Sequence, residues 1–155
     1  MERAGKTSWR ECGVLVARTP GFASWGWADA AMLLLDSTVL IAYLKGAPEA
    51  RDLVRPAVAG GEAAASVLSR VEIEGGMRSG ERSAVARLMG ALHLVPVSDP
   101  IAMRAGQFLR RYRRSHQGID VVDYVIAATA ELAGAQLATL NVKQFPMVAG
   151  LRPAF

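Results

Sequence analysis

Short apolar runs alternate with amphipathic stretches along this chain. Four runs, over residues 32–35, 63–67, 93–97 and 136–139, predict β-strands. Between consecutive runs, apolar residues recur at helical spacing in two separate blocks, which predicts two helices in each interval. Because parallel strands need crossover connections, this order predicts an α/β fold whose mainly parallel sheet lies between layers of helices. The predicted helices cover residues 39–44, 50–59, 69–75, 81–92, 99–115 and 119–130.

The pattern also distinguishes individual elements. The helix over residues 119–130 is almost wholly apolar, so it is expected to be central and covered. Pro96 lies in the third strand and removes one ladder donor, which favours an edge position. Residues 147–155 are expected to add an edge strand to the sheet. Ser69 and Glu72 have the spacing of a capping box, so one interpretation of Glu72 is a purely structural bond to the backbone of the cap.

The chain of 155 residues is long enough for one domain with an ordinary core. Residues 1–31 have no clear hydrophobic period. They are expected to be a leader that is disordered or not native, with Met32 as a possible start of the domain over residues 32–155. No apolar run approaches the roughly 20 residues that span a bilayer, so a cytoplasmic location without membrane contact is expected. The single cysteine, Cys12, cannot form an internal disulfide, in agreement with a reducing compartment.

The chain is basic, with a formal net charge of +4 and a sequence pI of about 9.7. Such a charge favours contact with a polyanion. Four arginines surround Tyr112 near the end of the fifth predicted helix, and we call them the basic cluster: Arg110, Arg111, Arg113 and Arg114. The basic cluster suits contacts with nucleic-acid phosphates, which supply affinity without sequence information. The alternative is a solvated helix end whose cations offset the helix dipole.

Acidic residues lie where predicted strands give way to helices. Asp36 directly follows the first strand and precedes an amphipathic run. The crevice at the carboxyl ends of parallel strands is where ligands bind, so Asp36 is a candidate site residue. Asp36 also suits a helix N-cap, and capping is the alternative. Glu72, Asp120 and Asp123 likewise lie at helix beginnings or beyond strand ends.

Carboxylates gathered in one crevice repel one another and raise each other's pKa, so such a group needs a cation. Oxygen ligands without paired histidine or cysteine favour magnesium, or manganese, over zinc. One or two such ions can activate a water for in-line attack on a phosphodiester and stabilise the leaving oxygen. The acids therefore predict metal-dependent hydrolysis of a phosphodiester.

Four segments, over residues 33–41, 69–75, 123–130 and 138–145, resemble the four motifs of the PIN-domain ribonucleases. They are most similar to the VapC-type toxins of bacterial toxin–antitoxin pairs, and their order and spacing cover nearly all of residues 32–155. The resemblance implies a three-layer α/β/α sandwich with four or five short strands, often a homodimer. It also implies a magnesium-dependent endoribonuclease that cuts structured cellular RNA and is neutralised by a cognate antitoxin protein.

The resemblance assigns roles to individual residues. Asp36, Glu72 and Asp123 correspond to the catalytic acids, with Asp36 and Asp123 as the metal ligands. Four polar residues are expected to support them: Ser37, Thr38, Asp120 and Asn141. Asp120 precedes Asp123 by one helical turn, so it either adds charge to the site or caps the helix. The family often has an aspartate where this chain has Asn141, and a neutral amide is a weaker magnesium ligand, which leaves the number of metal ions open.

The same residues allow two functions other than a nuclease. A binding module without catalysis would hold RNA or a protein through the basic cluster, with the acids acting only as helix caps. A phosphotransfer domain with Asp36 as the phosphorylated nucleophile is disfavoured, because haloacid-dehalogenase-like enzymes have a second aspartate two positions later, where this chain has Thr38. The sequence also contains no glycine-rich phosphate loop and no nucleophile elbow.

Overall fold

A computed structural model describes residues 32–155, so the prediction of a leader over residues 1–31 lies outside the described residues. The strands are β1 (Leu33–Leu35), β2 (Ala63–Ser66), β3 (His93–Val95) and β4 (Gln136–Ala138). The helices are α1 (Ser37–Leu44), α2 (Pro48–Ala59), α3 (Val67–Gly76), α4 (Arg82–Ala91), α5 (Asp99–Tyr112) and α6 (Val121–Ala133), with short 3-10 turns η3 (Ser79–Glu81) and η4 (Val142–Gln144). This succession confirms the predicted order of strands and paired helices.

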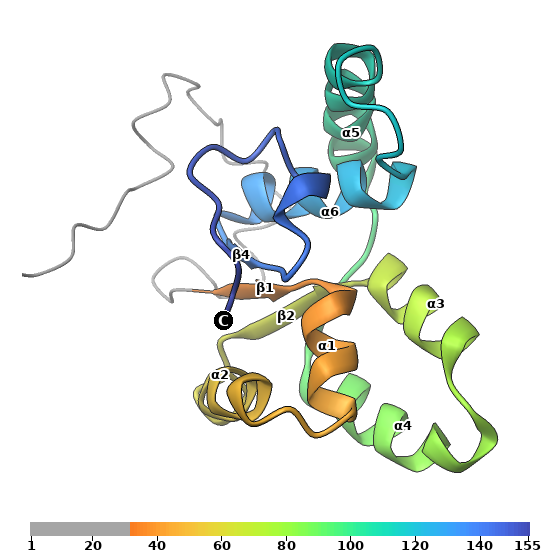
Figure 1. Ribbon diagram of the computed structural model, residues 1–155, viewed down its shortest axis with the longest axis vertical. Coiled ribbons are helices and arrows are strands. Elements are labelled where there is room, and N and C mark those ends of the chain that lie inside the picture. The colour runs from red at the N-terminus through yellow and green to blue at the C-terminus, as the bar shows by residue number, and fades with distance from the viewer. Residues whose placement is uncertain (1–31) are drawn as a thin grey trace, which may run out of the picture.

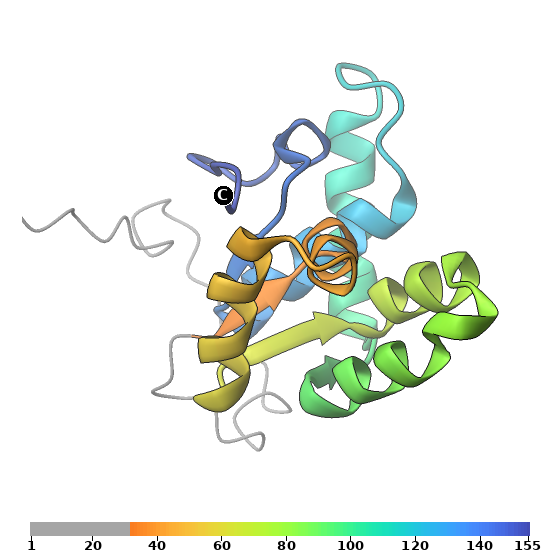
Figure 2. The ribbon, with the colours of Figure 1, turned by 60° about the horizontal axis from the view of Figure 1, so that its bottom comes forward.

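The four strands form one parallel sheet with the order β3-β2-β1-β4, which lies between two helical layers. Helices α5 and α6 cover one face, and α1 to α4 lie on the other side (Figure 1). Figure 2 brings this second side forward and shows α1 and α2 in front of β1 and β2. The predicted α/β/α sandwich is therefore confirmed with four strands.

The strand order decides where chemistry can occur. The central strand β1 pairs with both β2 and β4, and Leu35 lies in register with Ala138. The chain runs from β1 through β2 to β3 on one side of the sheet and then crosses to β4 on the other side of β1, so the carboxyl ends of β1 and β4 flank a topological switch point. Strand β3 is an edge strand, as the adjacent Pro96 predicted.

Helix α6 forms the centre of one core. Its residues from Tyr124 to Ala130 are all buried, as expected from their apolar run. They pack with Leu34, Ile101 and Phe108 on one face of the sheet. The helix ends at Gly134, whose φ of 64° is the left-handed conformation of a helix C-cap. No helix within residues 32–155 combines the length and the apolar character needed to cross a membrane.

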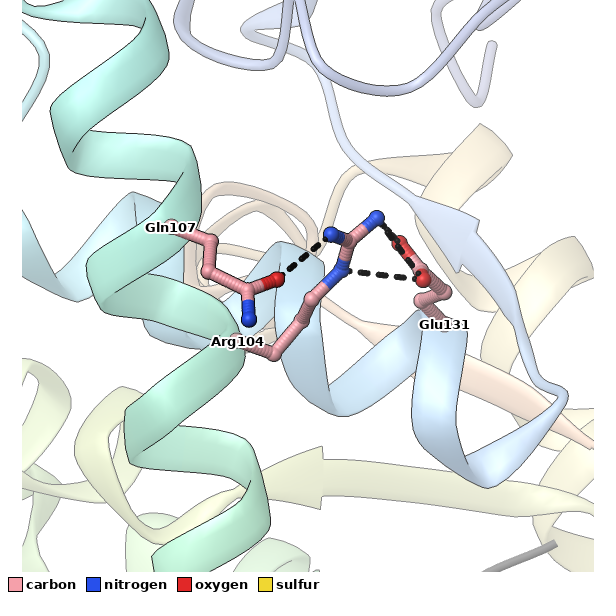
Figure 3. Close-up of polar contacts among 3 residues, drawn as sticks. All are labelled: Arg104, Gln107 and Glu131. Atoms are coloured by element: carbon pink, nitrogen blue, oxygen red, sulfur yellow. Dashed lines mark hydrogen bonds and ion pairs between the residues drawn. The ribbon is translucent and has the colours of Figure 1, made fainter. Parts of the chain in front are cut away.

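An ion pair fixes α5 against α6. The guanidinium of Arg104 donates from Nε and Nη2 to the two carboxylate oxygens of Glu131, each at 3.0 Å (Figure 3). Its Nη1 donates to Gln107 Oε1 at 2.9 Å, and its carbon lies 4.3 Å from the ring centroid of Phe108. Both charged side chains are about a quarter exposed, so water screens this pair less than a fully exposed one.

The predicted capping box of Ser69 and Glu72 is wrong. Strand β2 ends at Ser66, and the side chain of Ser66 caps α3 by accepting a hydrogen bond from Leu68 N at 3.2 Å. The helix therefore begins before Ser69, which is buried within it. Glu72 is consequently free of the structural role that the spacing offered it.

The predicted edge strand over residues 147–155 is also wrong. This segment contains no strand and makes one backbone bond to the end of β4, from Ala154 N to Thr139 O at 2.9 Å. Gly150 has a φ of 71°, which interrupts an extended conformation, and Pro153 has no N–H to donate to a ladder. The hydrophobic residues here instead pack on the core, with Val148 buried.

Candidate active site

Asp36 lies at the switch point, directly after β1. It occupies the N-cap position of α1, and its carbonyl accepts hydrogen bonds from Val39 N and Leu40 N. Its side chain makes no capping bond, so the carboxylate is not used as the alternative interpretation supposed. The residue is only 3% exposed. A buried acid that does not cap its helix needs another explanation.

Two threonine hydroxyls surround the carboxylate of Asp36. Thr38 Oγ1 donates to Asp36 Oδ2 at 2.7 Å, and Thr139 Oγ1 donates to the same oxygen at 2.8 Å. Ser37 Oγ is 3.5 Å from Oδ1, at the limit of a hydrogen bond. The first and last strands are thus joined at their carboxyl ends through one buried acid.

Glu72 extends from α3 to the same region. Partial burial raises the pKa of Glu72, and the charges of Asp36 and Asp120 raise it further, whereas a hydrogen bond with Ser37 lowers it. The residue as a whole is exposed, so it forms the solvent side of the site. Glu72 is therefore close enough to Asp36 for the two carboxylates to repel each other.

Asp123 lies in the first turn of α6 and completes the group. Burial raises the pKa of Asp123 to about 6, and the charges of Asp36, Glu72 and Asp120 add to this rise. A hydrogen bond from Asp120 N to Asp123 Oδ2, at 3.2 Å, acts in the opposite direction. Asp120 Oδ1 accepts from Val122 N at 3.0 Å, so Asp120 caps α6 and also contributes charge to the site. The structure confirms the cap, and a role of Asp120 in the site stays a prediction.

We refer to Asp36, Glu72, Asp120 and Asp123 as the acidic cluster. The cluster has no basic partner among residues 32–155, where the ion pairs are Arg70–Glu74 and Arg104–Glu131. Mutually repelling oxygen ligands without a compensating cation fit a hard divalent ion such as magnesium. In the part of the chain that the structure describes, no three acids, histidines or cysteines lie close enough together to hold a metal ion between them. The carboxylate of Asp123 accepts a hydrogen bond from Asp120 N, and that of Asp36 accepts hydrogen bonds from two threonine hydroxyls. These bonds fix the orientation of each carboxylate.

Asn141 and Thr139 follow β4, as Asp36 follows β1. Asn141 is exposed, and its backbone N–H donates to Thr139 Oγ1 at 3.0 Å, while its side chain makes no hydrogen bond with a described residue. Thr139 is the site residue that the sequence reasoning missed. The sequence placed Thr139 inside the fourth strand, but β4 ends at Ala138, so Thr139 occupies the position beyond β4 that Asp36 occupies beyond β1.

The basic cluster lies at the C-terminal end of α5, as predicted, and all four arginines are exposed. Arg111 lies 5.5 Å from the ring centroid of Tyr112, which in turn contacts His116 edge-on at 5.7 Å. None of the four arginines is in an ion pair with a described carboxylate. This end of α5 projects beyond α6 in Figure 1.

Comparisons with known proteins agree with this architecture. A family model described as the PIN domain matches residues 33–151. Ribonuclease VapC10 of Mycobacterium tuberculosis is 51% identical over 124 residues, covering 80% of this chain and 93% of that protein. Ribonuclease VapC19 of the same species is 42% identical over 125 residues, covering 80% of this chain and all of that protein. A toxin-antitoxin complex from Klebsiella pneumoniae has a chain with a TM-score of 0.65 at 22% identity, covering 79% of this chain and 98% of that chain.

Proposed function

The chain belongs to the PIN-domain family, and we propose that it is a VapC-type endoribonuclease, dependent on magnesium, that acts as the toxin of a toxin–antitoxin pair. The observation that carries this proposal is the acidic cluster at the carboxyl ends of β1 and β4, which lacks a basic partner among the described residues. The ribonuclease relatives, matched over nearly their whole length, supply the reaction class.

In this proposal Asp36 and Asp123 hold the metal, with Glu72 as the third catalytic acid. A bound magnesium ion, or manganese, would supply activation of the attacking water and stabilisation of the leaving oxygen. Asp123, with a pKa of about 6, is mostly ionised at pH 7 and is available as a ligand. Glu72 lies on the exposed side, where it can accept a proton from the water. Asp120 adds negative charge, and Ser37 supports the site from its place beside Asp36.

Asn141 affects the number of metal ions. It is exposed at the position where an aspartate is frequent in the family, and its amide brings no charge. A site with one fewer carboxylate favours one tightly bound ion over two. Isothermal titration with Mn²⁺ gives the stoichiometry, and Asn141→Asp is expected to add a second, weaker binding event.

The substrate is structured cellular RNA, held by its phosphates at the basic cluster. Four exposed cations without ion pairs among residues 32–155 are free to replace phosphate counterions. Changing all four arginines to glutamine should weaken RNA binding and flatten its salt dependence, with a slope in log K against log salt smaller by about 3. Unchanged slope would show that RNA binds elsewhere.

The proposed partners are a cognate antitoxin and a second copy of the chain, with the toxin acting in the cytoplasm. Support for the antitoxin comes from the likeness to a chain of a toxin-antitoxin complex. The genomic neighbour of this chain is expected to encode a small protein that abolishes its activity on co-expression. Light scattering of the purified chain measures its oligomeric state, and a monomeric mass would refute the homodimer.

The activity itself is tested by cleavage of cellular RNA, with 5′ ends sequenced after brief induction. The parent should cut at defined positions with Mg²⁺ and lose cleavage with EDTA. Asp36→Asn and Asp123→Asn should abolish both cleavage and growth inhibition while remaining folded by circular dichroism. Asp52→Asn, which changes an exposed aspartate on α2, is the matched control and should cleave normally. If the two site variants remain toxic, the chain is a binding module and not this nuclease.

A further inference from the structure

The two threonines beside Asp36 are themselves oriented by the backbone. Leu140 N donates to Thr38 Oγ1 at 3.1 Å, and Asn141 N donates to Thr139 Oγ1 at 3.0 Å. Each hydroxyl has a single proton, and the charged Asp36 carboxylate is nearer than the other threonine, whose oxygen is 3.4 Å away. Both protons therefore point to Asp36.

Both protons also reach the same oxygen of Asp36. A carboxylate oxygen offers about two lone-pair sites, so the donors from Thr38 and Thr139 fill Oδ2. Oδ1 has only the 3.5 Å contact with the Ser37 hydroxyl. One oxygen of this buried acid is saturated, and the other keeps free lone pairs.

We propose that Thr139 is a positioning residue, which together with Thr38 locks Asp36 so that Oδ1 is the oxygen presented to the metal. This inference rests on the proposed function, because it concerns the metal of that same site. It assigns the end of β4 a role in catalysis through a hydroxyl that touches neither metal nor substrate. Mutation of a residue that orients a metal ligand by a hydrogen bond typically lowers metal affinity by about 10–100-fold.

A purely structural role for the Thr139 hydroxyl is less well supported. Strands β1 and β4 are already joined by their ladder, and Asp36 N donates to Ala138 O at 2.9 Å at the point where the strands end. The strand pairing therefore does not need the side chain of Thr139. What the side chain adds is the orientation of one carboxylate.

The test measures Mn²⁺ affinity of the full chain by isothermal titration, without RNA. Thr139→Val removes the hydroxyl at nearly constant volume and should weaken binding by about 10–100-fold. Thr139→Ser retains the donor and should restore most of the affinity. The matched control is Thr129→Val, which removes a buried hydroxyl that donates to Val125 O at 2.7 Å within α6. This control should bind Mn²⁺ as the parent does.

Each outcome separates the two proposals. If the parent binds Mn²⁺ and Thr139→Val binds it equally well, the positioning role is overturned while the proposed function stands. If the parent binds no Mn²⁺, the metal-dependent function fails and this inference fails with it. Should Thr139→Val not fold by circular dichroism, Thr139→Ala removes the hydroxyl without adding a branched methyl. Parent-like affinity of Thr139→Ala overturns the positioning role in the same way.

Discussion

Neutralising Asp123 should stabilise the fold while it destroys the activity. The carboxyl of Asp123 has an ordinary pKa of 3.8, and burial followed by the charges of Asp36 and Glu72 raises it to about 6 in the folded chain. Between these two pH values the folded state binds more protons than the unfolded state, so stability falls as pH rises. Asp123→Asn removes the charge and keeps an oxygen that can accept the hydrogen bond from Asp120 N.

The size of the effect follows from the difference in pKa. A rise from 3.8 to about 6 corresponds to at most about 3 kcal/mol at pH 7. The group is only half-buried, and screening by solvent reduces the expected gain to about 1–2 kcal/mol. Below pH 3.8 the carboxyl is protonated in both states, so the gain should vanish there.

Urea unfolding of parent and Asp123→Asn in EDTA, at pH 7.5 and at pH 3.5, measures this difference. Asp52→Asn changes an exposed aspartate outside the acidic cluster and should alter stability by less than about 0.5 kcal/mol at either pH. Saturating Mg²⁺ should raise the stability of the parent by ligand linkage and leave the variant unchanged, which reduces or reverses the gain. The reasoning is refuted if Asp123→Asn is less stable than the parent at pH 7.5, or if its gain is the same at both pH values.

Three further changes test the packing described above, each by urea unfolding. The Tyr124 hydroxyl is buried without a hydrogen-bond partner among residues 32–155, so Tyr124→Phe should raise stability by about 1 kcal/mol, and a loss would reveal a partner. Gly134→Ala places a side chain at a φ of 64° and should lower stability by about 1–2 kcal/mol, whereas a neutral result would mean that the cap relaxes. Glu131→Gln removes the charge that pairs with Arg104 and should lower the free energy of unfolding by about 1 kcal/mol. Glu74→Gln, in the more exposed pair with Arg70 on α3, should lower it by less, and equal losses would contradict the screening argument.

Much of the fold follows from the hydrophobic pattern, because each strand is a short apolar run and each helix has its own period. The start of α3 could not be predicted in this way. Ser66 and Ser69 are equally good caps, and only the pairing of Ser66 with Val95 of β3 shows that the strand ends at the first of them. The segment over residues 147–155 has enough apolar residues for a strand, but its glycine and its one proline favour turns that bury single side chains.

The sequence predicts which strands and helices contribute to the site, but not the contacts between their side chains. Asp36 follows the carboxyl end of β1 and Asp123 lies in the first turn of α6, and the parallel topology brings those positions together. Glu72 was expected at a helix start but lies in the middle of α3, because that helix begins directly after Ser66. The contact between Asp36 and Thr139 spans 103 residues and depends on rotamers that no local pattern encodes. For the same reason, the free oxygen of Asp36 is visible only in the structure.

The pairing of the first strand with the last has a consequence for synthesis of the protein. A ribosome makes Asp36 early, but the partner strand with its Thr139 hydroxyl is added only about a hundred residues later. A nascent or prematurely terminated chain that stops before residue 136 lacks β4 and the Thr139 hydroxyl, so the carboxylate of Asp36 has no fixed orientation. In the proposed nuclease, the site is therefore ordered only once nearly the whole domain has been synthesised.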